Sequence, residues 1–190
     1  MSGSKDRDKR PRPKPVTELY LQNAAVYYLG RYSSSAANLG EVLGRKVRRR
    51  NEGQAPPTSE QQELIQKTVE RCIDLGLVND ADYAKSRALS LHASGKSLRR
   101  IETALRQKGV ESEDIEAAIS ALREERGGNI EREAALAYAR RRRFGPWRTR
   151  DGDADKKRKE LASFARAGFG YALASAIVEA TSIETLEDDD

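Results

Sequence analysis

The side chains that most often perform covalent catalysis are scarce in this sequence, which contains one cysteine, Cys72, and one histidine, His92. Catalysis by a nucleophile needs a base within hydrogen-bond reach, and neither residue has a convincing partner. Cys72 shares a helical face with Val69 and Ile73, so we expect a small buried hydrophobic side chain there. We expect His92, near a helix end, to be a surface or capping residue. The sequence therefore indicates a protein that is not an enzyme and needs no cofactor.

A run of alternating aspartates, Asp151, Asp153 and Asp155, imitates the first three ligands of a calcium-binding loop. The sixth position of that loop is Lys156 instead of glycine, and the twelfth is Ala162 instead of glutamate. The sharp turn and the bidentate ligand are therefore both missing. We expect a solvated loop that leads into a helix, where aspartate is favourable against the helix dipole, and no metal site.

Basic side chains are the functional groups that this sequence offers in number. Arginine donates in pairs to phosphate and carboxylate oxygens alike, so the partner could be a nucleic acid or an acidic protein groove. The four arginines 140–143 form a collar, because successive helical residues turn by about 100°. Trp147 could stack on bases or pack at a helix end. The candidate partner-binding residues are Arg45, Lys46, Arg48, Arg49, Arg50, Arg99, Arg100, Arg140, Arg141, Arg142, Arg143, Trp147, Arg148, Lys156 and Lys157.

The formal net charge of +5 is unevenly spread. Residues 1–16 carry six Lys/Arg against two Asp/Glu, and residues 129–183 carry twelve against seven. This distribution favours sequence-independent contact with polyanions, although solvated helix faces would carry similar charges. A single cysteine excludes an intramolecular disulfide framework, and no apolar run reaches the roughly 18 residues of a membrane span. We expect a cytoplasmic protein that touches no membrane.

The elements that must position these side chains are helices, because aromatic residues make up only 6% of a chain that is 34% charged. The middle third has the clearest pattern. Asn79, Ser97 and Ser112 are expected to cap three helices in turn, and Gly95 and Gly109 to end the first two. The first two helices span about three turns each. None of the three is long enough to be stable alone, so their apolar stripes must pack together.

The last third repeats this layout around a second glycine. Aligning Gly109 with Gly168 superposes four apolar positions. The superposed pairs are Leu105 with Phe164, Val110 with Phe169, Ile115 with Ala174 and Ile119 with Val178. Several matches around one helix-ending glycine indicate an internal repeat.

The first third is a more divergent copy of the same layout. Thr17 is expected to open its first helix, and the second helix runs into the arginines 48–50. A polar loop, residues 51–58, is inserted before the third helix, which we expect a capping box of Ser59 and Gln62 to open. Its second helix lacks the glycine that ends the second helix of the other copies.

The predicted fold is all-α, with three tandem three-helix repeats that form an elongated helical array. Units of 50 to 60 residues are small for independent cores, so neighbouring repeats should share surface. The expected segments are a disordered basic tail (1–16), a first repeat (17–78), a second repeat (79–128), a third repeat (129–183) and an acidic tail (184–190).

Several short motifs of the second and third repeats are distinctive when taken together. They read GLVNDADYA at 76–84 with Arg87, GKSLRRI at 95–101, LRQKGV at 105–110, ARRRRFG at 139–145 and FARAGF at 164–169. In these motifs the chain resembles the RecX family of recombination regulators over roughly residues 17–180. The first repeat departs from the family pattern at the end of its second helix and in the inserted loop.

The resemblance implies that the three repeats form a curved array, in a bacterial cytoplasmic protein that binds RecA filaments on single-stranded DNA. It also implies inhibition of the recombinase, ATPase and coprotease activities of RecA, without chemistry by this chain. We also expect the chain to be a monomer. Two other functions stay open on the residues alone. The chain could be a stand-alone single-stranded nucleic-acid-binding module, which the basic clusters and Trp147 favour, or a helical scaffold for an unrelated partner.

Overall fold

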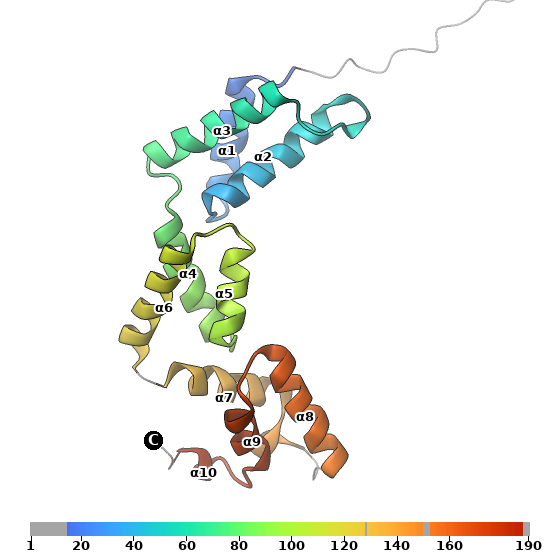
Figure 1. The fold of residues 1–190 in the computed structure, drawn as a ribbon, viewed down its shortest axis with the longest axis vertical. Coiled ribbons are helices and arrows are strands. Elements are labelled where there is room, and N and C mark those ends of the chain that lie inside the picture. The colour runs from blue at the N-terminus through green and yellow to red at the C-terminus, as the bar shows by residue number, and fades with distance from the viewer. Residues whose placement is uncertain (1–14, 128, 150–152, 188–190) are drawn as a thin grey trace, which may run out of the picture. The chain divides into compact units, whose positions relative to one another are not determined.

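The computed structural model describes residues 15–127, 129–149 and 153–187, and every regular element among them is helical (Figure 1). The all-α fold is thereby confirmed. In chain order the elements are α1 (Glu18–Leu29), α2 (Ala36–Arg50), the 3₁₀ helix η1 (Glu52–Gln54), α3 (Ser59–Asp74), α4 (Asp80–Ala93), α5 (Leu98–Arg106), α6 (Ser112–Arg126), α7 (Ile130–Arg142), the 3₁₀ helix η2 (Gly145–Trp147), α8 (Ala154–Ala167), α9 (Tyr171–Glu179) and α10 (Glu184–Glu187).

The chain divides into two compact units, residues 1–78 and 79–190. The division coincides with the predicted end of the first repeat. Helices α1–α3, termed the first module, enclose one hydrophobic cluster. The second unit contains two such clusters. One is formed by α4–α6, the second module, together with Ile130 of α7, and the other by α7–α9, the third module, together with Leu186 of α10. The predicted boundary between the second and third repeats stays a prediction, because their contacts join them in one unit.

The first module begins where the sequence predicts. The Thr17 hydroxyl accepts a hydrogen bond from the Tyr20 N–H at 3.2 Å and so caps α1. The fully buried Leu39 and Leu43 of α2 pack with Leu21 of α1 and with apolar side chains of α3, including Cys72. The expected burial of Cys72 is confirmed, and burial raises the pKa of its thiol.

The predicted capping box of α3 is wrong by one residue. Thr58, not Ser59, caps the helix: its hydroxyl accepts from the Gln61 N–H at 3.3 Å, and the Gln61 side-chain oxygen accepts from the Thr58 N–H at 3.1 Å. Gln61, and not Gln62, is selected because its side-chain amide also pairs with that of Asn51, at 2.9 and 3.0 Å. These contacts close the inserted loop on itself.

The second module is opened by Asn79 and its second helix by Ser97, as predicted, since their side chains accept from the N–H groups of Asp82 and Arg100. The expected cap at Ser112 is wrong. Helix α6 already includes Ser112, and the capping position is held by Glu111 without a side-chain hydrogen bond.

The internal repeat around Gly109 and Gly168 is visible in the backbone. Both glycines have positive φ, +68° and +90°. The residue after each glycine donates a backbone hydrogen bond to the last turn of the preceding helix. The Val110 N–H donates to the carbonyl of Leu105 at 3.2 Å, and the Phe169 N–H donates to that of Phe164 at 3.1 Å. All eight superposed apolar residues are buried. The alignment therefore identified equivalent core positions.

The two predicted tails are described only in part. Residues 1–14 and 188–190 lie outside the described residues. Val16, which was expected in the disordered tail, packs against the first hydrophobic cluster. The segment expected to start an acidic tail instead forms α10, whose Leu186 is buried in the third cluster because this apolar side chain finds a place beside α7.

Candidate functional site

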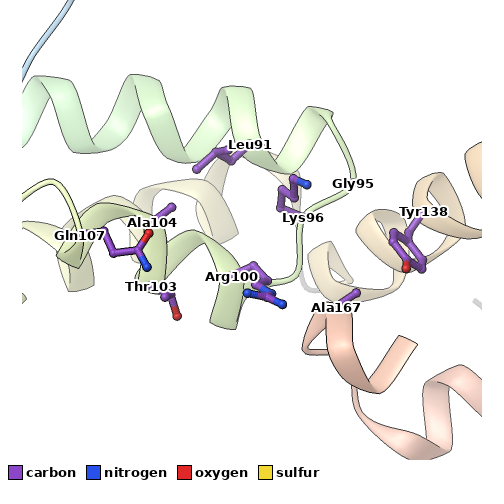
Figure 2. Close-up of a pocket in the computed structure, with 9 residues that line it drawn as sticks. All are labelled: Leu91, Gly95, Lys96, Arg100, Thr103, Ala104, Gln107, Tyr138 and Ala167. Carbon is purple, nitrogen blue, oxygen red and sulfur yellow. The ribbon is translucent and has the colours of Figure 1, made fainter. Parts of the chain in front are cut away.

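A cleft lies in the second unit, where α5 faces α7 and the end of α8 (Figure 2). One hollow of this cleft has a volume of about 240 Å³ and is lined by apolar Leu91 and Ala104 together with polar side chains. A neighbouring hollow of about 280 Å³ shares Arg100 and Thr103 with the first. The polar residues that line the two hollows are Lys96, Arg99, Arg100, Thr103, Gln107, Tyr138 and Arg166.

Two glycines let the α4–α5 turn approach the third module closely. Gly95 has φ +70°, and a Cβ atom there would lie 3.0 Å from the backbone nitrogen of Tyr138. Gly168 has φ +90°, and a Cβ atom there would lie 2.7 Å from the Ser97 hydroxyl oxygen. That hydroxyl donates to the carbonyl of Ala167 at 2.7 Å. The same glycines that end helices therefore also set the width of the cleft.

Further polar contacts join the second module to the third module beside the cleft. His92 is buried and its Nε2 lies 2.7 Å from the carbonyl oxygen of Ile130, so the ring donates from Nε2. The expectation of a surface or capping histidine is wrong, because the imidazole joins α4 to the start of α7. The Leu98 N–H donates to the Glu131 carboxylate at 2.9 Å.

Two of the predicted partner-binding arginines also join the second module to the third. The Arg100 guanidinium donates to the carbonyl of Arg166, and the Arg141 guanidinium donates to that of Ser94. Arg100 and Arg141 are both exposed to solvent. The structure thus places Arg99 and Arg100 of α5 in one hollow with Arg166 of α8, which was not among the predicted residues.

Arg166 and Gln107 were missed although a signal was present. The alignment of Gly109 with Gly168 superposes these two residues, each two positions before its glycine. Both line the cleft, so equivalent positions of the repeat contribute to it.

Charge follows the order of helices within each module. The second helix of each module is basic: α2 carries five Lys/Arg against one Asp/Glu, α5 three against one, and α8 five against two. The third helix of each module is acidic: α3 carries two Lys/Arg against four Asp/Glu, α6 two against five, and α9 none against one. The basic clusters in the sequence are thus the second helices of a repeating unit, extended in the third module by the end of α7.

The cluster on α2 lies beside tyrosines of α1. The Arg50 guanidinium carbon lies 3.9 Å from the ring centre of Tyr20, and the Lys46 ammonium lies 6.0 Å from that of Tyr27. Arg31 of the following turn lies 3.8 Å from the ring centre of Tyr27. Such distances are typical of cation–π contacts. The first module therefore presents cations and aromatic rings side by side.

The remaining α2 arginines are exposed to solvent. Arg45 pairs with Glu41 at 3.5 Å on the surface, a contact of little energetic consequence. Arg48 and Arg49 are exposed at the end of the helix, where positive charge is favourable against the helix dipole.

The collar at the end of α7 is spread around the helix, as its consecutive arginines require. Arg140 and Arg142 are exposed, while Arg143 ends the helix in the left-handed conformation with φ +57°. Arg142 also lies 5.7 Å from the ring centre of Tyr138, which lines the cleft.

Arg148 has a structural position instead of the expected partner-binding one. Its side chain is 11% exposed and that of Glu160 is 3% exposed. The guanidinium donates to both carboxylate oxygens of Glu160, at 2.8 and 2.6 Å, and to the Val178 carbonyl at 2.7 Å. Because a buried ion pair of this kind is fully occupied within the third module, Arg148 is not available to a partner. Trp147 is half-buried against the same cluster.

The basic run of α8 contains one paired segment. Lys156 and Lys157 are half-buried, whereas the exposed Lys159 and Arg158 both reach Asp155 at 2.6 Å. Hydrogen bonds from Lys159 and then Arg158 hold the pKa of Asp155 below its usual range. Asp151 of the calcium-like run lies outside the described residues, and among the residues that are described no cluster of His, Cys, Asp or Glu forms a metal site.

No helix within the described ranges is long and apolar enough to cross a membrane.

Comparison with known proteins relates this fold and these motifs to one family. A family model described as RecX, second three-helix domain, matches residues 79–119. Regulatory protein RecX of Myxococcus xanthus is 37% identical over 177 residues, which cover 92% of this chain and 93% of that protein. Regulatory protein RecX of Agrobacterium fabrum is 30% identical over 165 residues, which cover 87% and 85%.

A solved structure has a similar fold. The crystal structure of RecX from Lactobacillus salivarius superposes with a TM-score of 0.61 at 22% sequence identity. The superposition covers 85% of this chain and 94% of that chain, so the likeness extends over nearly the whole fold.

Proposed function

The chain belongs to the RecX family of regulatory proteins, and from this premise we propose that it binds RecA filaments on single-stranded DNA and inhibits RecA. The activities restrained are strand exchange, ATP hydrolysis and coprotease activity. The chain itself acts as a monomer in the cytoplasm and catalyses no reaction. The observation that carries the proposal is the basic second helix of every module, because a RecA filament on DNA is a long, repeating, phosphate-containing partner.

The mechanism needs only several weak contacts made together. Each module presents exposed arginines, for example Arg49 on α2, Arg99 on α5 and Arg142 at the end of α7. Single exposed ion pairs contribute little, but contacts on one chain reinforce each other through effective concentration. A chain that touches adjacent RecA subunits and the enclosed strand at once would block filament extension or subunit association.

A RecA activity assay tests the proposal directly. We expect added protein to slow DNA-dependent ATP hydrolysis and strand exchange by RecA of the same organism. Unchanged rates of both reactions would contradict the proposal and leave a helical scaffold for another partner.

The second candidate function is stand-alone binding of single-stranded nucleic acid, which the Tyr20 and Tyr27 rings beside the α2 cations favour. The two functions are separated by comparing affinity for bare single-stranded DNA with affinity for RecA-coated DNA at physiological salt. Tighter binding to the bare strand would favour the second candidate.

The collar at the end of α7 provides a prediction on inhibition. Arg140→Glu combined with Arg142→Glu should weaken inhibition of RecA roughly tenfold or more, since two exposed cations are replaced by anions that repel phosphate and carboxylate. Arg141 is left in place because it holds the Ser94 carbonyl. The matched control is Arg123→Glu with Arg126→Glu on the acidic α6, which should change inhibition little. Equal losses in both double variants would exclude a specific role for the collar.

A further inference from the structure

The charge pattern singles out the same helix in each module, and α2, α5 and α8 are each positive while α3, α6 and α9 are each negative. We propose that the second helices contact the phosphate backbone of single-stranded DNA directly, and that the tyrosines beside α2 stack on its bases. This inference rests on the function proposed above and deepens it, because it names the DNA strand of the filament as what these helices touch.

The opposite charges of the second and third helices determine which side of a module a polyanion approaches. A polyanion is attracted by the cations of the second helix and repelled by the carboxylates of the third. The cations occupy different positions on α2, α5 and α8, so the sign of the charge is repeated although the individual residues are not. A phosphate backbone requires positive charge along its path and no fixed pattern of side chains.

The cleft between α5 and α8 has the chemistry of a phosphate site. Arg99 and Arg100 of α5 and Arg166 of α8 line the hollow of about 280 Å³ together with the Thr103 side chain. A guanidinium has five N–H donors, so Arg100 can hold the Arg166 carbonyl and a phosphate oxygen at once. The carboxylate of this helix, Glu102, lies 3.9 Å from Arg106, farther along α5.

The first module favours a nucleic acid over an acidic protein as the partner. Tyr27 is 61% exposed although the Arg31 guanidinium lies over its ring. An acidic peptide would use only the cations, whereas single-stranded DNA uses cations for phosphates and aromatic rings for bases of any sequence. Tyr20 repeats the arrangement two turns earlier with Arg50. Two such pairs along α1 and α2 match a strand that carries alternating phosphates and bases.

The contact of α2 is tested by binding of a fluorescent oligo-dT strand to the full chain across roughly 50 to 200 mM salt. Arg48→Gln with Arg49→Gln should reduce the slope of log affinity against log salt by about 1.4, since each lost phosphate contact on a single strand contributes about 0.7. The control in the same unit is Lys67→Gln with Arg71→Gln on α3, two exposed cations whose loss should change the slope little. A control effect as large as that of the α2 pair would overturn the inference.

The cleft is tested in the same way within the second unit. Arg99→Gln with Arg166→Gln removes one cation from each side of the cleft and keeps the clamp of Arg100. We expect the slope to fall by about 1.4 again. The control is Arg123→Gln with Arg126→Gln on α6. Circular dichroism of each variant verifies the helical fold, and a slope that is unchanged in a folded cleft variant would overturn the contact there.

The stacking role is tested with substitutions of Tyr27 that remove or keep the aromatic ring and leave the charge unchanged. Tyr27→Leu should lower the affinity for oligo-dT roughly tenfold, while Tyr27→Phe, which keeps the ring, should bind nearly as tightly as the original chain. An abasic strand of the same length should bind equally to all three. Tyr171→Leu on α9, where the tyrosine is 74% exposed, is the control. Equal loss with leucine and phenylalanine would overturn the stacking role.

The outcome also separates this inference from the function on which it rests. A chain that inhibits RecA but ignores oligo-dT at low salt would overturn the inference and leave the proposed function intact. A chain that binds poly-glutamate as tightly as oligo-dT, with no effect of Tyr27→Leu, would replace DNA by an acidic protein. A chain that binds oligo-dT as expected without altering RecA activity would refute the proposed function and keep the strand contact.

Discussion

Gly168 has two structural roles, one in the turn that ends α8 and one in the contact between the second and third modules. Its φ of +90° favours glycine, and a Cβ atom would also meet the Ser97 hydroxyl that donates to Ala167. The residue therefore serves the local turn and the contact between the second and third modules at once. Gly44 is its opposite, since a Cβ atom there meets nothing within 4 Å and the residue lies inside α2.

These two glycines give opposite predictions for stability. Gly168→Ala should lower the free energy of unfolding by roughly 2 to 5 kcal/mol, the sum of left-handed strain and overpacking. Gly44→Ala should raise it by about 0.5 to 1 kcal/mol, because alanine is the better residue inside a helix. Urea denaturation of both variants measures the difference. A Gly168→Ala chain as stable as the original would mean that the turn has room to move.

The roles of single arginines were harder to predict than their number. Arg100, Arg141 and Arg148 all belong to basic runs, yet each donates to a backbone or side-chain oxygen that lies 66, 47 and 12 residues away along the chain. No local pattern marks such partners, because only the fold brings them together. The arginine-rich partner surfaces therefore stay a prediction, and the sequence alone did not separate a buried arginine such as Arg148 from the exposed ones.

The helices themselves were predictable because their signals are local. Ser97 and Asn79 cap helices through N–H groups three residues ahead, and Gly109 ends one through its own positive φ. The choice between two adjacent hydroxyl residues, Thr58 and Ser59, was not local. It depends on Asn51 at the end of α2, which holds Gln61 in place.

The corrected start of α3 can be measured. Thr58→Ala should cost about 1 kcal/mol of stability, since it removes the side chain that caps the helix. Ser59→Ala, one residue later, lies within the first turn and should change the free energy of unfolding by less than about 0.5 kcal/mol. Chemical denaturation of the two single variants, followed by far-ultraviolet circular dichroism, compares them. The reverse order would restore the capping box expected from the sequence.

The complete chain contains one probe in each compact unit. Its single cysteine, Cys72, is buried in the unit of residues 1–78, and its single tryptophan, Trp147, is half-buried in the unit of residues 79–190. Burial raises the pKa of the thiol, which leaves less of the reactive thiolate at a given pH in the folded unit. Thiol labelling therefore reports opening of the first unit, and indole fluorescence reports unfolding of the second.

We expect these probes to give different denaturation midpoints, because each unit encloses its own hydrophobic clusters. Gly168→Ala should shift the fluorescence midpoint and leave the labelling midpoint in place. Gly44→Ala should do the reverse. Coincident transitions in all variants would show that the two units unfold as one.

The alternation of basic second helices and acidic third helices has a kinetic consequence. Each module has unlike charge on neighbouring helices, so an approaching polyanion experiences a torque as well as an attraction, and is oriented before any contact forms. Encounters would then be productive more often than chance collisions. Added salt should slow capture far more than it hastens release.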